Sequence, residues 1–249
     1  MTARVSFDFT GTRALVTGAT SGIGHAVARL FRDAGATVTI TGTRAAAGDY
    51  DTDLTGLTYR RLVLTDPDSV AAAAAEITEL DVLINNAGAN FPGGLDESDP
   101  DGFDASVALN LLGHYRLTAA LHPALRVSTA RGGASVVNLS SMSAMRAVTL
   151  VPGYGAAKAG LINLTRNLAV KWAGDGIRVN AVAPGLVDTP MTAPMHSIPS
   201  VLDGELAHIP LRRFGNTAEV AATVAFLCTE HSSYTSGAVF VVDGASDCL

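Results

Sequence analysis

A chain of 249 residues that is 48% hydrophobic and 16% charged has enough apolar surface for a sizeable core and too little charge for an intrinsically disordered protein. The formal net charge of -6 gives no basic footprint, so nucleic acid is excluded as an expected partner. Apolar residues are scattered rather than gathered into a membrane-length run, and the N-terminus has no signal-peptide core, so we expect a cytoplasmic chain without membrane contact.

Short β-branched runs alternate with longer helical patterns along the whole chain, which predicts βαβ units and a parallel sheet. In chain order, the predicted strands are residues 13–17, 37–41, 61–64, 81–85, 134–138, 177–181 and 238–242, and the predicted helices are residues 22–34, 66–79, 103–127 and 153–172. No stretch rich in proline, glycine or serine divides the chain. We therefore expect residues 1–249 to form a single α/β domain, a doubly wound, seven-stranded parallel sheet flanked by helices.

Residues 184–210 interrupt this regular pattern. They hold five prolines and several polar residues, which favour a mobile loop over a domain boundary. Apolar side chains such as Met191, Ile198 and Leu202 stand among few charged ones. A loop of this composition would suit an apolar or moderately polar compound and offers no clamp for a phosphorylated one.

A glycine-rich turn follows the first predicted strand directly and opens the first predicted helix. Its glycines, Gly18, Gly22 and Gly24, lack the side chains that would keep a pyrophosphate away from the backbone N–H groups at the positive end of that helix. Thr20 and Ser21 add hydroxyl donors to the same turn. The strand–turn–helix context therefore predicts a dinucleotide site.

The end of the second predicted strand bears on the choice of cofactor. A carboxylate there usually binds the ribose 2′-hydroxyl of NAD, whereas NADP sites supply a cation. Here the strand runs into Gly42-Thr43-Arg44, with no acidic residue until Asp49. A hydroxyl and a guanidinium suit a 2′-phosphate, so we predict a preference for NADP(H). The alternative is that Arg44 is only a solvated loop charge, in which case NAD serves as well.

Tyr154 and Lys158 stand four residues apart, on one face of a predicted helix. A carbonyl reduced by hydride transfer needs a proton, and a phenol with a pKa of about 10 is a reluctant donor or base at neutral pH. A neighbouring lysine, together with a cationic oxidised nicotinamide, stabilises the phenolate and lowers that pKa. Ser140 and Ser141 follow the fifth predicted strand at the edge where doubly wound sheets bind ligands, and one of them is expected to orient the substrate oxygen.

These motifs, in this order, resemble those of the short-chain dehydrogenase/reductase family over essentially the whole chain. The resemblance implies a Rossmann-type fold and assigns four catalytic roles. Ser141 would hold and polarise the carbonyl, Tyr154 would be the general acid in reduction, and Lys158 would lower the pKa of the tyrosine and hold the nicotinamide ribose. Asn110 would anchor a water that relays protons from Lys158 toward solvent.

The resemblance also implies which residues contact the cofactor. Asn86 through Gly88 would line its adenosine side, and the segment after the Pro184-Gly185 turn would face its carboxamide. Val63 replaces the Asp or Asn that the family often carries, so only backbone contacts remain for adenine there. The implied contacts, in chain order, are Gly18, Thr20, Ser21, Gly22, Ile23, Gly24, Thr43, Arg44, Leu64, Asn86, Ala87, Gly88, Tyr154, Lys158, Pro184, Gly185, Val187 and Thr189.

The C-terminal pattern, residues 210–215 and 242–244, resembles the bacterial 3-oxoacyl-thioester reductase branch. That branch implies a homotetramer, or a homodimer, in which the apolar edge strand 239–242 is covered by a partner subunit. It also implies a substrate-binding insertion at about 186–210. The first substrate to expect is a 3-oxoacyl thioester, reduced with NADPH, and Arg212 with Arg213 is either a docking patch for its carrier or a solvated face.

Two other functions remain open at this stage. One is an oxidative NAD(P)-dependent dehydrogenase of a sugar, polyol or steroid alcohol on the same scaffold. The other is a non-catalytic nucleotide-binding regulator, although such a protein would be expected to lose Tyr154 or Lys158. No metal site is expected, because the six histidines show no metal-ligand spacing.

Overall fold

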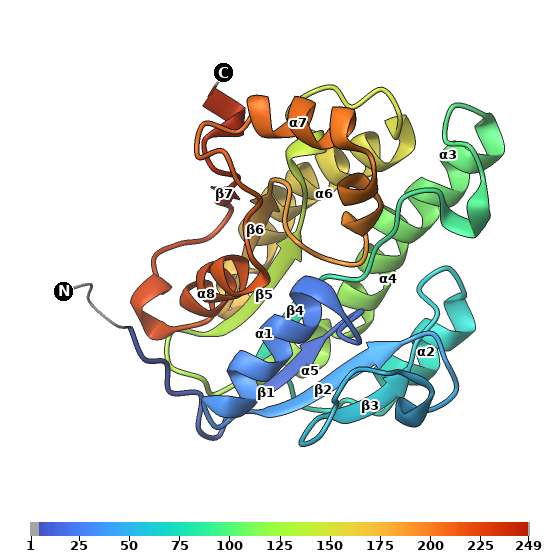
Figure 1. Cartoon of the computed structure of the whole chain (residues 1–249). Helices are drawn as coiled ribbons and strands as arrows, with labels where there is room; N and C mark the ends of the chain where they lie inside the picture. The colour runs from blue at the N-terminus through green and yellow to red at the C-terminus, as the bar shows by residue number, and fades with distance from the viewer. Residues whose placement is uncertain (1–4, 249) are drawn as a thin grey trace.

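Residues 5–248, which the computed structural model describes, form one parallel sheet with helices on both faces (Figure 1). The strands are β1 (Arg13–Val16), β2 (Thr37–Gly42), β3 (Thr58–Arg61), β4 (Val82–Asn85), β5 (Ala134–Leu139), β6 (Ile177–Pro184) and β7 (Val239–Val242). The helices are α1 (Gly22–Asp33), α2 (Pro67–Ala75), α3 (Pro100–Val107), α4 (Gly113–Ala120), α5 (His122–Arg126), α6 (Pro152–Trp172), α7 (Pro199–Ala207) and α8 (Thr217–Leu227). None of them is long and apolar enough to cross a membrane.

The strand order β3-β2-β1-β4-β5-β6-β7 confirms the predicted doubly wound sheet. The chain winds outward from β1 to β3 and then returns to place β4 on the other side of β1. The loops after β1 and β4 therefore diverge at the carboxyl edge of the sheet. Open α/β sheets bind their ligands at this topological switch point.

Two apolar clusters cover the two faces of the sheet. On one face, α1 and α8 pack side by side, with Val27 and Phe31 of α1 and Val220 and Val224 of α8 fully buried. On the other face lie α2, α4, α5 and α6, which bury side chains such as Trp172. Strands β4, β5 and β6 are buried on both sides, which explains their nearly continuous apolar sequences.

The third strand was predicted at residues 61–64, but β3 ends at Arg61. Tyr59 pairs with Ile40, and Leu62 donates one further N–H to Gly42 before the chain turns away. Leu62 and Leu64 are buried in the cluster beneath α2 and α4. Their apolar pattern therefore comes from packing under helices and not from pairing in the sheet.

The helix predicted for residues 66–79 ends at Ala75, and the long helix predicted for 103–127 is built from several pieces. The first piece begins earlier than predicted, at Pro100. The first N–H groups of a helix have no partner within the helix, so proline, which lacks an N–H, is well tolerated at this position. A π-helical turn, Ala108–Leu112, joins α3 to α4, and α5 begins just before Pro123.

The loop predicted for residues 184–210 contains regular structure. A 3-10 turn, Ala193–Ser197, precedes α7, which begins at Pro199. None of the residues of α7 is buried, so the helix has no apolar periodicity that a sequence pattern would reveal. Two of the five prolines that suggested an irregular loop, Pro194 and Pro199, stand in the first turns of these two elements.

Candidate active site

Three segments meet at the carboxyl edge of the sheet around the glycine-rich turn after β1. The Asn86 side chain donates to the carbonyls of Thr17 (2.9 Å) and Gly18 (3.1 Å), and the Thr17 hydroxyl accepts from the N–H groups of Asn86 and Ala87. Asn86 thus ties the turn to the loop after β4. The segment after β6 closes the other side, where Thr189 would lie 3.4 Å from a Cβ added at Gly22.

The glycines of this turn are required by its geometry. Gly18 has a φ of +62°, and a Cβ added there would lie 2.7 Å from the Cα of Ala87. Gly24 has no room for a side chain beside Asn86 and Ala19. This backbone cradle, which opens α1 at its positive end, fits the pyrophosphate of a dinucleotide.

The remaining predicted cofactor residues border the same edge of the sheet. Ser21 is the residue before α1 and Ile23 lies in its first turn. Leu64 is buried beside Gly113, and Pro184 ends β6, while Gly185 approaches Asp243 closely.

Arg44 is folded back on its own loop. Its guanidinium stands over the Tyr50 ring, 4.8 Å from the centroid, and bonds to the carbonyl of Asp49. Its backbone N–H donates to the Tyr50 hydroxyl (2.9 Å), and its carbonyl accepts from the hydroxyl of Tyr59 (2.6 Å). Thr43 and Arg44 are both exposed, directly beyond the end of β2. A group that enters from solvent can therefore reach both residues.

The catalytic pair predicted on one helix lies at the start of α6. Lys158 Nζ lies 5.3 Å from the centroid of the Tyr154 ring and donates to the carbonyl of Leu139 (2.7 Å) at the end of β5. Burial lowers the pKa of Lys158 to about 8. Burial also raises the pKa of Tyr154 to about 12, and the charge of Glu97 adds to this rise. The protein chain by itself therefore favours the neutral phenol.

The two serines after β5 have separate roles. Ser140 is buried and donates its hydroxyl to the carbonyl of Lys158 (3.0 Å), which fixes the first turns of α6 against β5. Ser141 instead lies close enough to Tyr154 for its side chain to lower the pKa of the tyrosine, against the larger effect of burial, and it accepts a hydrogen bond from the hydroxyl of Ser143 (2.9 Å). Ser141 is thus the serine that can share a substrate oxygen with the tyrosine.

Asn110 is buried within the π-helical turn between α3 and α4, a kind of turn that is frequent at functional sites. Its amide donates to the carbonyls of Ala89 and Ser106 (both 3.0 Å) and accepts from the N–H of Ala89 (3.2 Å). A Cβ added at Gly88 would lie 2.7 Å from Asn110 Oδ1 and 3.5 Å from Lys158 Nζ. The side chains of Asn110 and Lys158 therefore come together beside Gly88.

Sequence reasoning missed two buried polar residues near Tyr154 and Lys158. Glu97 is 1% exposed and accepts the backbone N–H of Tyr154 (2.6 Å). His114 is fully buried, bonds through Nε2 to the carbonyl of Ala87 (2.7 Å), and has its pKa lowered to about 3 by burial and by the charge of Lys158. Glu97 belongs to an acidic stretch that resembles a solvated loop, so no sequence signal marked it.

The helical segment after β6 is joined to the catalytic loop. Arg146, five residues beyond Ser141, forms an ion pair with Glu205 of α7 (3.0 Å). Within the segment, Thr192 donates its hydroxyl to the carbonyl of Val187 (2.6 Å). Figure 1 shows α7 at the same end of the sheet as these loops. The position fits a segment that borders the substrate.

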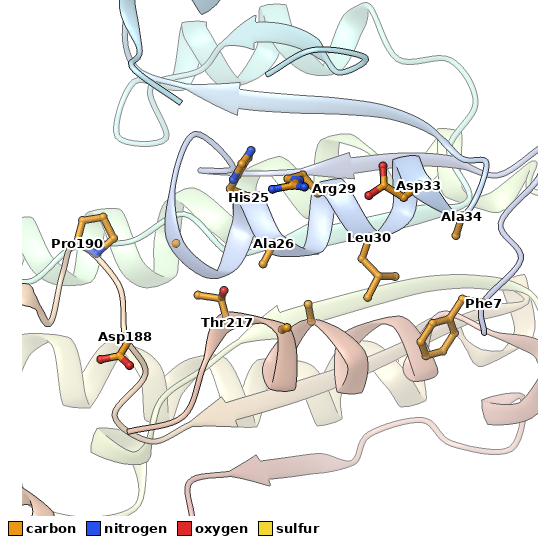
Figure 2. Close-up of a pocket in the computed structure, with 13 residues that line it drawn as sticks. Phe7, His25, Ala26, Arg29, Leu30, Asp33, Ala34, Asp188, Pro190 and Thr217 are labelled. Carbon is orange, nitrogen blue, oxygen red and sulfur yellow. The ribbon is translucent and has the colours of Figure 1, made fainter. Parts of the chain in front are cut away.

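A large open groove, of about 740 Å³, lies elsewhere, between α1 and α8 (Figure 2). His25, Arg29 and Asp33 of α1 line one wall, and Thr217 at the start of α8 faces them. Gly22 and Pro190 connect the groove to the edge of the glycine-rich turn. None of the four predicted catalytic residues lines it, so we do not place the chemistry there.

Known proteins resemble this chain over nearly its full length. A family model described as enoyl-(acyl carrier protein) reductase matches residues 18–245. Cis-4-hydroxycyclohexanecarboxylate dehydrogenase of Sinomonas cyclohexanicum is 41% identical over 93% of this chain and 94% of its own length. Galactitol 2-dehydrogenase (L-tagatose-forming) of Cereibacter sphaeroides is 36% identical over 98% of each chain.

Two further matches concern acyl substrates and cofactor. A 3-oxoacyl-[acyl-carrier-protein] reductase of Thermotoga maritima is 36% identical over 94% of this chain and 97% of its own length. Among solved structures, the RhlG/NADP active-site complex of Pseudomonas aeruginosa superimposes with a TM-score of 0.86 at 30% identity, covering 98% of this chain and all of that chain.

Proposed function

The chain belongs to the short-chain dehydrogenase/reductase family and acts on alcohol or ketone groups; we propose that it prefers NADP(H) and interconverts a ketone and a secondary alcohol, with Tyr154 as the acid or base. The observation that carries the proposal is the juxtaposition of Ser141, Tyr154 and Lys158 at the carboxyl edge of the sheet. Our leading substrate is a 3-oxoacyl thioester.

In reduction, Tyr154 donates its phenolic proton to the carbonyl oxygen while the Ser141 hydroxyl holds that oxygen by a hydrogen bond. Because the pKa of Tyr154 is about 12, the phenol carries its proton at neutral pH. Lys158, with a pKa of about 8, is mostly charged there and stabilises the phenolate that the transfer leaves. A bound nicotinamide supplies the hydride in reduction and accepts it in oxidation.

The glycine-rich turn, the loop after β4 and the segment after β6 would hold this cofactor. Thr43 and Arg44 would bind the 2′-phosphate of NADP, for which Arg44 has to exchange its contacts with Tyr50 and Asp49 for phosphate oxygens. The complex of the Pseudomonas aeruginosa relative with NADP supports this choice of cofactor.

Replacing Arg44 by Ala is expected to raise the KM for NADPH by about tenfold or more and to leave the KM for NADH nearly unchanged, because only NADPH carries the phosphate. Steady-state kinetics with each cofactor measure this. Arg29→Ala, at an exposed position of α1 that none of the predicted cofactor residues occupies, is the control for loss of one surface charge. Equal effects on both cofactors would contradict the assignment of Arg44.

Reduction is expected to slow as the pH rises through about 8, because Lys158 then loses the charge that stabilises the phenolate. The Lys158→Arg variant keeps a cation at every accessible pH, so its profile should lack this decline, whatever its absolute rate. The pH dependence of kcat for the two enzymes is the measurement. An identical decline in both would assign it to another group.

The relatives give equal support to two classes of substrate. The acyl-carrier-protein reductase relative favours a 3-oxoacyl thioester, whereas the galactitol and hydroxycyclohexanecarboxylate dehydrogenases favour a polyol or ring alcohol. The experiment compares kcat/KM for reduction of an acetoacetyl thioester with kcat/KM for oxidation of galactitol and of cis-4-hydroxycyclohexanecarboxylate. A higher value for the thioester supports our leading substrate, and a higher value for either alcohol replaces it.

We propose that four copies assemble. The apolar side chains of Phe226 on α8 and Val241 on the edge strand β7 are 39% and 41% exposed, and Tyr115 and Val170 on α4 and α6 are 45% and 82% exposed. Two separate apolar surfaces on one chain suit the two interfaces of a dihedral tetramer. Sedimentation equilibrium reports the number of copies directly.

A further inference from the structure

Glu97 is a buried carboxylate that holds two segments of the site together. It lies in the loop before α3 and is 1% exposed. One of its oxygens accepts the backbone N–H of Phe91 (3.0 Å), and the other accepts the backbone N–H of Tyr154 (2.6 Å). A buried charged group is costly unless it is hydrogen-bonded, so both partners stabilise this position.

The start of α6 depends on this carboxylate. The first N–H groups of a helix have no partner within the helix, and a polar side chain just before it usually caps one of them. Here that position is Val151, which has no polar side chain, and the next residue, Pro152, has no N–H. Glu97 reaches across from another loop to do the capping, and its negative charge suits the positive end of the helix.

Gly153 makes this approach feasible. A Cβ added at Gly153 would lie 3.2 Å from Glu97 Oε2, 3.0 Å from the Cβ of Ser106 and 3.1 Å from the Cα of Phe103. The first turn of α6 is therefore packed tightly against α3 and against the carboxylate. The direction in which Tyr154 leaves the helix is set by these contacts.

The second segment that Glu97 holds is strained. Phe91 has a φ of +48°, a left-handed conformation that is unfavourable for residues with a side chain. It lies two residues after Ala89, whose backbone binds Asn110 through two hydrogen bonds. Glu97 thus links the loop that fixes Asn110 to the helix that carries Tyr154.

We propose that Glu97 is a positioning residue for the reaction: its carboxylate fixes the first turn of α6 and thereby aims the Tyr154 hydroxyl at Ser141. The inference rests on the proposed function in that Tyr154 is taken as the acid. Glu97 touches the backbone of Tyr154, not the reacting atoms.

The charge of Glu97 has a second consequence, for the proton on Tyr154. Three other groups face the tyrosine or its lysine: the hydroxyl of Ser141, the ammonium of Lys158 on the same helix, and His114 of α4, whose pKa of about 3 keeps it neutral. Burial raises the pKa of Tyr154 most, the charge of Glu97 raises it further, and the nearby side chain of Ser141 lowers it. Removing the charge of Glu97 should therefore make the phenolate easier to form.

Glu97→Gln is the principal variant, because it keeps the size and one acceptor oxygen but removes the charge. Two readouts apply. Hydrogen–deuterium exchange of the peptide that spans the start of α6 needs no substrate and should become faster at Tyr154. In the oxidation direction, kcat should fall by about tenfold or more. The pH at which kcat is half-maximal should also fall, to a point where the hydrogen-ion concentration is about threefold higher or more. The KM for NADPH should change little.

Two other variants complete the test. Asp101→Asn removes an exposed carboxylate close by in the same acidic stretch and should match the wild type in every readout. Glu97→Asp keeps the charge, so its pH profile should be closer to that of the wild type than its kcat is. If Glu97→Gln does not fold, Glu97→Asp takes its place in the test. Loss of stability and rate without any change in the pH profile would reduce Glu97 to a structural role and overturn the proposal.

The outcomes also separate this inference from the proposed function. Faster exchange at α6 in Glu97→Gln, in an enzyme that turns over none of the tested substrates, would leave the contact established and the proposed function refuted. An active wild type whose exchange and pH profile are unchanged in Glu97→Gln would refute the role of Glu97 and leave the function intact.

Discussion

Tyr154→Phe is expected to lower kcat by about 100-fold or more while the affinity for NADPH stays within about twofold of the wild type. The substitution removes only the hydroxyl, which lies near Ser141 and which we propose as the proton donor to the carbonyl oxygen. General acid catalysis typically contributes about 100-fold to 10,000-fold, which sets the size of the loss. Steady-state turnover together with a fluorescence titration of NADPH measures both quantities.

Tyr234→Phe is the matched control, because the Tyr234 side chain is fully exposed in the turn before β7. It should retain wild-type turnover. A Tyr154→Phe enzyme with turnover close to that of the wild type would show that the proton comes from another group. If Tyr154→Phe lost turnover and NADPH affinity to the same extent, Tyr154 would instead be a residue that binds the cofactor.

Gly18→Ala is expected to weaken NADPH binding by about tenfold or more and to lower the free energy of unfolding by about 1–2 kcal/mol. A side chain at a φ of +62° is disfavoured by about that amount, and the new Cβ would meet the Cα of Ala87 at 2.7 Å. Neither backbone can yield without opening the cradle between the loops after β1 and β4. Thermal unfolding and a binding titration measure the two effects.

Gly174→Ala provides the comparison, because no heavy atom lies within 4 Å of a Cβ added there. That variant should keep wild-type affinity and stability. The account of the cradle fails if Gly18→Ala binds NADPH as tightly as Gly174→Ala does, since the close approach of the backbone would then not matter for the cofactor.

The sheet was largely predictable because its central strands are buried on both faces. That burial requires apolar runs, and the helices between them follow a different period, so β4, β5 and β6 lie close to the predicted ranges. The prediction failed at the third strand. The apolar stretch from Leu62 to Leu64 packs under α2 and α4, and periodicity cannot distinguish a residue buried under a helix from one paired in a sheet.

The sequence pattern did not predict the helix within residues 184–210, for a related reason. Helix α7 buries no side chain of its own, so no apolar stripe marked it. The ion pair between Arg146 and Glu205, which ties α7 to the loop after β5, joins positions 59 residues apart in the sequence. A contact at that separation leaves no local pattern.

The candidate site was likewise predictable only in part. Tyr154 and Lys158 were recognisable because their spacing on one helix is itself the chemical arrangement, and the structure places them against Ser141. Residue types alone left open which serine of the pair faces the tyrosine, because this depends on how α6 packs on β5, and only the family resemblance selected Ser141. Glu97 was missed because its partner is a backbone N–H 57 residues away.

The most direct test of the central claim is the fate of the hydride. NADPH that carries deuterium at the transferable position of its nicotinamide is incubated with the enzyme and an acetoacetyl thioester, a ring ketone or a ketose, and the alcohol formed is analysed by mass spectrometry. We predict that the deuterium appears on the carbinol carbon of at least one product, and that Tyr154→Phe forms this product about 100-fold more slowly. NADPH that binds but transfers no deuterium to any of the three carbonyl classes would contradict the account.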